Sequence, residues 1–462
     1  MEFIVQLISR AYGLLWGDLI TLPLPGGGSI GLSLLVLLLI PTGIFFTIRT
    51  RFLPVRLFPE MLRLTVEKRG TDGSAISGLQ ALVISTATRV GMGNLIGVVA
   101  AISAGGAGAV FWMWLSALIG SSTAFVEATL AQLHKQPDPL YGGYRGGPAY
   151  YIHDFLAKGR RKSLIAVLFA ISGLICWCGI SQVISNSVSS AFYNAFSVPP
   201  LYTTVALVAV SAVIVLRKHA TVKVLDVLVP IMAGCYFLMT IFLIVKNAAL
   251  LPSVFSQIFE EAFGIRQAVA GGFGAVLMQG VKRGLFSNEA GSGSAPCAAA
   301  AADITHPAKA GLLQAFGVFL DTIVICSCTA MIMLLTPAEK IAGLSGMDLL
   351  QTAMDYHLGS FGVVFIALIL LLFSFSTFIG VLFYARSNVA YLFGDNWASQ
   401  TAYKILALVM LFVGGLAAYT FVWDLGDVGI GLMTVFNIAV ILPMSREALA
   451  SLREYESLRK KR

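Results

Sequence analysis

The sequence contains about eleven apolar runs that are each long enough to cross a lipid bilayer. A spanning helix needs about 20 predominantly apolar residues. The 462-residue chain is 57% hydrophobic and 12% charged, with a mean hydropathy of +0.85, whereas a soluble protein carries about 25% charged residues. We therefore predict an all-α polytopic membrane protein with about eleven transmembrane helices. These lie near 29–49, 76–104, 108–133, 163–196, 200–217, 223–247, 267–301, 309–336, 358–385, 401–421 and 425–444.

Lysine and arginine are distributed unevenly between the connecting segments. With the C-terminus inside, the inner segments hold 24 of the 31 basic residues and the outer segments hold four, while three lie within membrane runs. Positively charged loops stay on the cytoplasmic side of a membrane. The pattern therefore predicts a multi-pass protein with a cytoplasmic C-terminus and an N-terminus outside. The net charge of +8 is explained by this topology, and nucleic-acid binding is not expected.

One run, 267–301, is interrupted by residues that do not suit a continuous membrane helix. Its stretch 284–296 reads Gly-Leu-Phe-Ser-Asn-Glu-Ala-Gly-Ser-Gly-Ser-Ala-Pro and includes the carboxylate of Glu289. Glycine and proline loosen a helix, and serine and asparagine compete for its hydrogen bonds. An intramembrane carboxylate is a functional-site hypothesis by default. The stretch is either unwound around a binding site or a kink packed against a neighbouring helix.

A second interrupted run lies about 200 residues upstream. Residues 86–94, Thr-Ala-Thr-Arg-Val-Gly-Met-Gly-Asn, again place small, polar and charged side chains in mid-span. If the first apolar run is set aside, the interrupted runs open two blocks of five helices. Because five is odd, the second block enters the membrane from the opposite face. Broken helices at matching places of an inverted repeat indicate a secondary transporter; the alternative is a coincidence between two flexible helices.

We therefore predict five segments in the chain. Among the ten core helices that follow the first apolar run, the first and sixth are expected to be discontinuous. The segments are an N-terminal amphipathic segment (1–28), an extra transmembrane helix with a basic cytoplasmic loop (29–75), a first five-helix repeat (76–247), a second five-helix repeat (248–444) and a basic cytoplasmic tail (445–462).

Other classes of function lack the residues that they require. The five histidines fall in predicted loops or at helix ends, and the six cysteines show no Cys-x-x-Cys spacing. No Gly-x-x-x-x-Gly-Lys-Ser/Thr loop occurs. We therefore expect neither an enzyme nor a cofactor. The lipid bilayer is the expected environment, and we infer no obligate protein partner. A channel stays possible, although no pore-forming repeat is evident.

Interrupted membrane helices can bind both a substrate and an ion. Helix N-termini suit a carboxylate, whereas carbonyl and hydroxyl oxygens suit a sodium ion. Ser376 and Thr377 offer hydroxyls in mid-span, although such hydroxyls often bond their own backbone. Arg89 and Glu289 are charges of the two breaks, and we expect them to compensate each other because an unpaired intramembrane charge is costly.

Several blocks of the chain resemble the alanine/glycine:cation symporter family, also called the sodium:alanine symporters, which has the inverted-repeat fold of the neurotransmitter:sodium symporters. The blocks are 89–94, 108–114, 146–152, 284–296, 317–322 and 423–427. The resemblance covers most of the chain from Gly78 to Asn437. It implies sodium- or proton-coupled uptake of small neutral amino acids across a bacterial or archaeal plasma (inner) membrane.

The resemblance also implies roles for individual residues. The backbone carbonyls of Ala87 and Val90 would bind sodium together with the hydroxyls of Ser376 and Thr377. The remaining predicted residues would bind the substrate: Gly91, Met92 and Gly93 hold its carboxylate, Phe286, Ser287 and Asn288 face its amino group, and Asn94, Gln182 and Val381 complete the pocket. For Gln182, a hydrogen bond between helices is an equal alternative.

The chain departs from the family's pattern at three places. Met92 stands where many relatives have threonine or serine, Val381 stands where a pocket tryptophan is expected, and Ala385-Arg386 replaces a frequent Gly-Glu pair. These differences concern the substrate rather than the fold. Glu127 and Asp321 are each a structural acid, a proton carrier or a second cation ligand.

The sequence therefore predicts a secondary active transporter. Its function would be sodium-coupled symport of a small neutral amino acid, such as alanine, glycine or serine, into the cell. The alternative is a proton-coupled or larger-solute transporter of the same fold.

Overall fold

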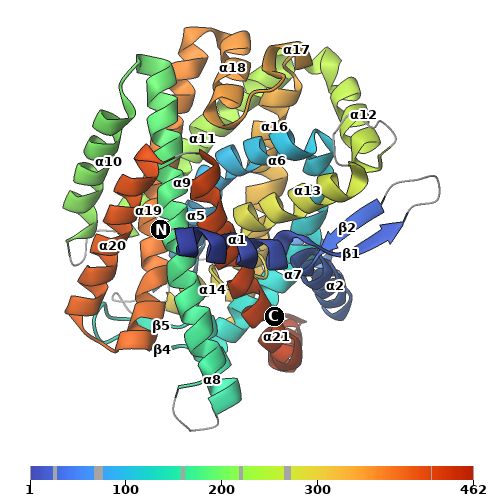
Figure 1. Cartoon of the computed structure of the whole chain (residues 1–462). Helices are drawn as coiled ribbons and strands as arrows, with labels where there is room; N and C mark the ends of the chain where they lie inside the picture. Colours follow the sequence, from blue (N-terminus) through green and yellow to red (C-terminus); the bar gives the residue numbers. More distant parts are fainter. Residues whose placement is uncertain are drawn as a thin grey trace.

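The computed structural model of the chain is a bundle of helices (Figure 1). It describes residues 2–23, 29–66, 76–157, 162–217, 222–264, 272–417 and 419–460. Within these residues, eight helical spans are long and apolar enough to cross a membrane. Six lie in the single helices α7 (Gly108–Leu133), α9 (Leu164–Phe196), α11 (Val222–Lys246), α19 (Ser360–Phe393), α20 (Trp397–Leu416) and α21 (Tyr419–Lys460). Two are composite: one joins α5 (Gly78–Thr88), η1 (Arg89–Gly97) and α6 (Val98–Gly105), and the other joins α15 (Pro307–Val318), η3 (Phe319–Cys326) and α16 (Ser327–Leu334).

The three other predicted runs correspond to shorter helices. The apolar helices α2 (Leu34–Arg49) and α10 (Pro200–Val215) have 16 residues each, fewer than the roughly 20 of a typical crossing. The run 267–301 is divided between α13 (Gly272–Asn288) and α14 (Pro296–Ala301). The helical membrane class is thus confirmed, while the number of eleven crossings stays a prediction.

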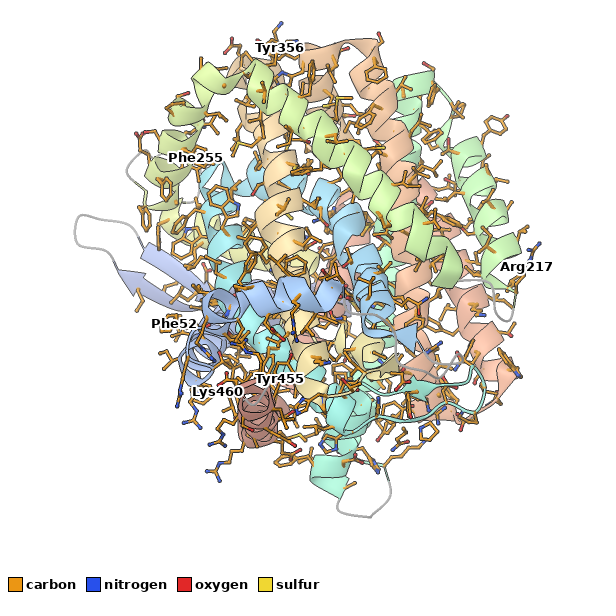
Figure 2. All side chains as sticks on the ribbon, turned by 180° about the vertical axis from the view of Figure 1, so that it is seen from behind. Phe52, Arg217, Phe255, Tyr356, Tyr455 and Lys460 are labelled. Carbon is orange, nitrogen blue, oxygen red and sulfur yellow. The ribbon has the colours of Figure 1, made fainter. Side chains whose placement is uncertain are left out.

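The two ends of the bundle carry different connecting elements. Figure 1 shows α8 (Pro148–Ala157), the paired strands β4 (Gln136–Pro137) and β5 (Tyr144–Arg145) and the C-terminus toward one end. The helices α12 (Leu251–Ala262), α17 (Ala338–Ile341) and α18 (Gly346–Leu358) lie at the other end. In Figure 2, Lys460 and Tyr356 lie toward these same two ends. The described parts of the predicted cytoplasmic segments 134–163 and 446–462 therefore share one end of the molecule.

The two helices expected to be discontinuous are interrupted in different ways. Between α13 and α14, residues 289–295 are not helical, which is the break that the composition predicts. In contrast, α5, η1 and α6 follow one another without a gap, and η1 is a π-helix. The prediction of an unwound first core helix is therefore wrong in form. A π-helix bonds residue i to residue i+5, so its backbone groups stay satisfied inside a membrane.

The N-terminal segment contains more than the amphipathic helix expected there. After α1 (Glu2–Trp16), the chain forms an antiparallel hairpin of β1 (Asp18–Pro23) and β2 (Ser29–Ser33). The transmembrane helix predicted from residue 29 therefore begins only at Leu34. Residues 29–33 pair with β1 instead, and this local hairpin is not visible in the apolar pattern.

The predicted tail 445–462 is a continuation of α21, apart from its last two residues, which lie outside the described part. It packs against the protein rather than extending freely. Arg56 forms an ion pair with Glu456 (2.7 Å), and Tyr455 donates a hydrogen bond to the buried Glu60. The remaining short elements are α3 (Leu53–Arg56), α4 (Phe58–Thr65), β3 (Ile76–Ser77), η2 (Ala248–Leu250) and β6 (Ala302–Asp303).

Two groups of helices enclose the interrupted elements. α9 packs against α19, α20 and α21, while α7 packs against α13 and α15. η1 contacts both α13 and α19, and η3 contacts η1. The candidate site therefore lies where η1, α13, α19 and η3 meet in the interior of the bundle.

Candidate functional site

η1 and α19 approach each other closely at Gly91. A methyl group added to Gly91 would come within 3.0 Å of Thr377 Oγ1. The backbone N–H of Met92 donates a hydrogen bond to the same oxygen (3.3 Å). Thr377 lies near the middle of the 34-residue α19. A predicted sodium ligand thus touches the interrupted helix halfway along its span.

The other predicted sodium ligands lie beside this contact in the chain. Ala87 belongs to the last turn of α5, and Val90 belongs to the first turn of η1. Ser376 is fully buried, and its Oγ donates to Phe373 O (2.9 Å). This is the backbone bond that is common for hydroxyls in membrane helices. The sodium role of these residues stays a prediction.

The unwound residues between α13 and α14 are held by side chains of neighbouring helices. The Gly291 N–H donates to Glu127 Oε2 of α7 (3.1 Å), and Asn437 Nδ2 of α21 donates to Gly291 O (3.0 Å) and to the Glu127 carboxylate. Gly291 has a φ of +98°, which glycine adopts without steric cost. These bonds satisfy backbone groups that the break frees, as irregular backbone at membrane depth requires. Glu127 therefore has a structural role in this arrangement.

Asn94 and Ser287, both predicted to bind substrate, meet at one carboxylate. Asn94 Nδ2 donates to Asp321 Oδ1 (2.7 Å), and Ser287 Oγ donates to Asp321 Oδ2 (2.9 Å). Asn94 Oδ1 in turn accepts a hydrogen bond from the Gly91 N–H (3.3 Å). Since Asp321 belongs to η3, three interrupted or π-helical elements converge at this point.

Gly93 and Phe286 lie in contact across the same junction. A methyl group added to Gly93 would lie 3.4 Å from Ser287 Cα and 3.8 Å from Phe286 Cδ1. On α9, Gln182 is buried, and its Nε2 donates to Met410 Sδ of α20 (3.3 Å). Its Oε1 has no hydrogen-bond partner among the described residues. The amide nitrogen thus makes the contact between helices that we considered, while the oxygen is available to a ligand.

Asn288 is not brought together with the other predicted substrate residues. It lines a cavity of about 20 Å³ that is also lined by Leu39 of α2 and Thr123 of α7. Successive residues of a helix point about 100° apart, so Ser287 faces η1 and η3 while Asn288 faces α2 and α7. Sequence spacing alone did not separate these two directions.

Val381 is buried on the face of α19 that meets the interrupted helices. Residues three and four apart share a helix face. Val381 therefore lies between Thr377, which contacts η1, and Tyr384, whose Oη donates to Glu289 Oε2 (3.3 Å). This position is compatible with the predicted pocket role.

The structure gives Arg89 and Glu289 different neighbours. Arg89 Nη1 donates to Gln314 O of α15 (3.2 Å), whereas Glu289 accepts the hydrogen bond from Tyr384. These bonds give each charge a polar neighbour on a different helix, and the expected compensation between Arg89 and Glu289 stays a prediction.

Two adjacent cations of α13 share one acid of α21. Lys282 Nζ lies 2.6 Å from Asp427 Oδ2, and Arg283 donates to both Asp427 oxygens (3.2 Å each). Trp16 of α1 donates from Nε1 to Asp427 O (3.0 Å). No local pattern in the sequence assigns a partner to either cation. The block 423–427 was the available signal, but it did not identify the partner.

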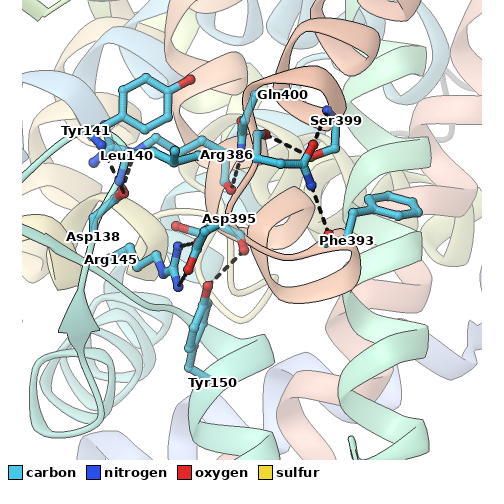
Figure 3. Close-up of polar contacts among 12 residues, drawn as sticks. Asp138, Leu140, Tyr141, Arg145, Tyr150, Arg386, Phe393, Asp395, Ser399 and Gln400 are labelled. Atoms are coloured by element: carbon cyan, nitrogen blue, oxygen red, sulfur yellow. Dashed lines mark hydrogen bonds and ion pairs between the residues drawn. The ribbon is translucent and has the colours of Figure 1, made fainter.

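Another polar cluster joins α19 to the β4–β5 loop (Figure 3). The Arg386 guanidinium lies 5.0 Å from the centre of the Tyr141 ring, with Asp138 Oδ2 3.9 Å away. Arg145 donates two hydrogen bonds to Asp395, just beyond the end of α19, and they hold the pKa of Asp395 below its usual value. The unusual Arg386 thus has a defined neighbourhood far from the Gly91 contact.

Comparisons with known proteins agree with this architecture. The sequence model of the sodium:alanine symporter family matches residues 27–462. The chain is 43% identical to the probable sodium/glutamine symporter GlnT of Bacillus subtilis, covering 93% of this chain and 89% of the relative. It is 33% identical to the sodium/alanine symporter AgcS of Methanococcus maripaludis, covering 92% and 95%. The solved structure of MhsT in complex with L-phenylalanine shares the fold, with a TM-score of 0.57, 15% identity and coverage of 82% and 93%.

Proposed function

Because this chain belongs to the sodium:alanine symporter family, we propose that it couples sodium entry to the uptake of a neutral amino acid. The family consists of transporters and not of enzymes. The observation that carries the proposal is the contact of Thr377 with Gly91 and Met92 in mid-span. We place the protein in the plasma membrane with its N-terminus outside and its C-terminus in the cytoplasm, from the distribution of Lys and Arg.

The proposed sodium site combines backbone and hydroxyl oxygens. Ala87 and Val90 would supply carbonyls, and Ser376 and Thr377 would supply hydroxyls. Sodium is a hard cation that prefers oxygen ligands. The placement of Thr377 against η1 supports this arrangement, since η1 carries the Val90 carbonyl and directly follows the turn of α5 that carries the Ala87 carbonyl. Proton coupling through the same fold is the alternative.

The proposed substrate site lies beside it. Gly91, Met92 and Gly93 would bind the carboxylate through backbone N–H groups. Phe286 and Ser287 would face the rest of the substrate, with Asn94, Gln182 and Val381 around it. The free Oε1 of Gln182 supports a polar contact, because a buried unpaired oxygen is costly unless a ligand or water satisfies it.

The hydrogen bonds of η1 suggest how the two ligands are coupled. The N–H of Gly91 is bonded to Asn94 Oδ1, and the N–H of Met92 is bonded to Thr377 Oγ1, both at 3.3 Å. A carboxylate is a stronger acceptor than either neutral oxygen, so a bound substrate would replace them. Thr377 Oγ1 would then no longer accept the Met92 N–H and could offer that lone pair to sodium. Each ligand would therefore increase the affinity for the other, as linkage requires.

The size of the substrate is the finer part of the proposal. We favour a small neutral amino acid such as alanine, glycine or serine. A larger neutral amino acid is the second candidate, supported by valine rather than tryptophan at position 381 and by the similarity to a probable sodium/glutamine symporter. Each extra buried methylene would contribute about 0.8 kcal/mol, which is roughly fourfold in affinity.

Sodium-gradient counterflow in proteoliposomes tests the whole proposal. The purified protein would be assayed against a panel of neutral amino acids, with a potassium gradient and a proton gradient as matched controls. We expect uptake that requires the sodium gradient and is abolished when that gradient is collapsed. Uptake that follows the proton gradient alone would replace sodium by protons as the coupling ion. A uniform rate in all gradients would refute coupling.

A further inference from the structure

Asp321 lies close to the middle of a membrane span and is fully buried. The span that joins α15, η3 and α16 runs from Pro307 to Leu334, so Asp321 is about equally far from both ends. None of its side chain is exposed. A carboxylate in such a position is costly unless neighbouring groups satisfy it.

Three side chains from three elements satisfy this carboxylate. Asn94 of η1 donates to Oδ1 (2.7 Å), Ser287 of α13 donates to Oδ2 (2.9 Å), and Thr322 of η3 donates to Oδ2 (2.7 Å). Asn94 Nδ2 also donates to the Asp321 backbone carbonyl (3.0 Å). Asp321 therefore connects the two interrupted helices through one acceptor.

The orientation of Asn94 depends on the same carboxylate. Because Nδ2 is directed at Asp321, the other end of the amide, Oδ1, is directed at the Gly91 N–H. Ser287, the partner of the other carboxylate oxygen, packs closely against Gly93. A methyl group added to Gly93 would lie 3.4 Å from Ser287 Cα. Displacing the carboxylate would release Asn94 and Ser287 at once. Gly91 and Gly93 would then no longer be held in place against α13.

We propose that Asp321 is a positioning residue that holds η1 and α13 in the arrangement that binds the substrate. The inference rests on the proposed function of this site, but it assigns Asp321 no contact with substrate or ion. Asn94, Ser287 and Thr322 use three of the roughly four acceptor positions of this carboxylate, which is what a positioning role requires.

Four variants and one control test the inference by transport. Asp321→Ala removes all three hydrogen bonds, whereas Asp321→Asn keeps the shape and removes the charge. Asn94→Asp places a second carboxylate against Asp321, and the two negative charges repel each other. Combining Asn94→Asp with Asp321→Asn exchanges the two side chains, so that one amide again donates to one carboxylate. Thr329→Val is the matched control, because it removes a buried hydrogen bond to Tyr236 (2.8 Å) from the same span, eight residues beyond Asp321, and that bond involves none of the partners of Asp321.

We expect Asp321→Ala to raise the KM for the amino acid by about tenfold to a hundredfold, the equivalent of one or two lost hydrogen bonds to a charged group. The sodium concentration for half-maximal uptake and the pH profile of Asp321→Asn should stay near wild type. The exchanged pair should transport better than either single variant, and Thr329→Val should leave KM unchanged. A large rise in the sodium requirement of Asp321→Asn, or no recovery in the exchanged pair, would overturn the positioning role.

Hydrogen exchange separates this inference from the proposed function, because it needs no substrate. Amides of residues 89–97 and 272–288 should exchange faster in Asp321→Ala than in wild type or in Thr329→Val. If wild type shows no sodium-driven uptake but exchange rises in Asp321→Ala, the proposed function fails and the positioning role stands. Equal exchange in all three proteins refutes the positioning role, whatever the substrate is.

Discussion

The contact between Gly91 and Thr377 makes a sharp prediction for Gly91→Ala. The added methyl group would come within 3.0 Å of Thr377 Oγ1 and lie 3.3 Å from Thr377 Cβ. Thr377 is buried, so its side chain has little room to move. Either α19 moves away from η1, or Thr377 changes rotamer and loses its hydrogen bond from the Met92 N–H.

The magnitude follows from three contributions. Overpacking a tight interior costs about 1–3 kcal/mol, and a lost hydrogen bond costs about 1 kcal/mol. Replacing glycine by alanine within a helix recovers about 1 kcal/mol. We therefore expect a net loss of about 1–3 kcal/mol in the free energy of unfolding. Thermal unfolding of the purified protein in detergent would measure the direction of the change.

Gly97→Ala is the matched control for this variant. It lies in the same π-helix, but its added methyl group would meet nothing closer than Phe286 Cδ1 at 3.8 Å, an ordinary contact. Gly97→Ala should therefore melt at or slightly above the wild-type temperature. If both glycine variants behave alike, the close approach of α19 to η1 does not exist as the structure places it.

Combining Gly91→Ala with Thr377→Ala separates packing from ion binding. The combined variant should recover thermal stability relative to Gly91→Ala, because the clashing oxygen is gone. It should not recover the sodium dependence of uptake, because the proposed ligand is gone as well. Recovery of both properties would exclude Thr377 from the sodium site.

Three other predictions concern the proposed ligands and charges. Replacing Ser376 and Thr377 by alanine together should raise the sodium concentration for half-maximal uptake far more than the amino-acid KM; an unchanged sodium dependence would exclude them. Arg89→Ala and Glu289→Ala should give nearly additive losses in transport and stability, because the structure gives them different neighbours; strong coupling in the double variant would restore the ion pair expected from the sequence. Val381→Trp should shift competition toward alanine and glycine by excluding larger substrates. The same ranking of glycine, alanine, serine and leucine in wild type and variant would remove Val381 from the pocket.

The sequence was most informative where composition contradicts the surrounding helix. Glycine, serine and proline between residues 289 and 296 cannot support a regular membrane helix, so the break between α13 and α14 was predictable. The first interruption was expected at residues 86–94, and the π-helix that overlaps this stretch runs over Arg89–Gly97; its π-helical form was not predictable. Whether a turn unwinds or widens depends on the neighbours that meet it, and these come from distant parts of the chain.

Partners of buried charges were the least predictable part of the site. Lys282 and Arg283 could have faced Glu289 by sequence alone, yet both pair with Asp427. Which acid the two cations meet depends on how α13 is rotated about its axis relative to α21, and no local sequence pattern determines this rotation. Asn288 shows the same limit, because one residue along a helix changes direction by about 100°.

The buried site lies between two polar clusters that join different helices. Asp427 is about eight residues from the start of α21, in the half of that helix remote from the C-terminus, and it pairs with Lys282 and Arg283 of α13. Arg386 is close to the opposite end of its own helix, α19, on the side of α8 and the β4–β5 loop. Between them, the side chains predicted to bind substrate are fully or almost fully buried. If the chain is the sodium-coupled transporter proposed above, substrate must reach this site without both clusters opening together, because that would dissipate the sodium gradient. The two clusters share no residue, so each could open while the other stays closed, as alternating access in the predicted inverted repeat would require.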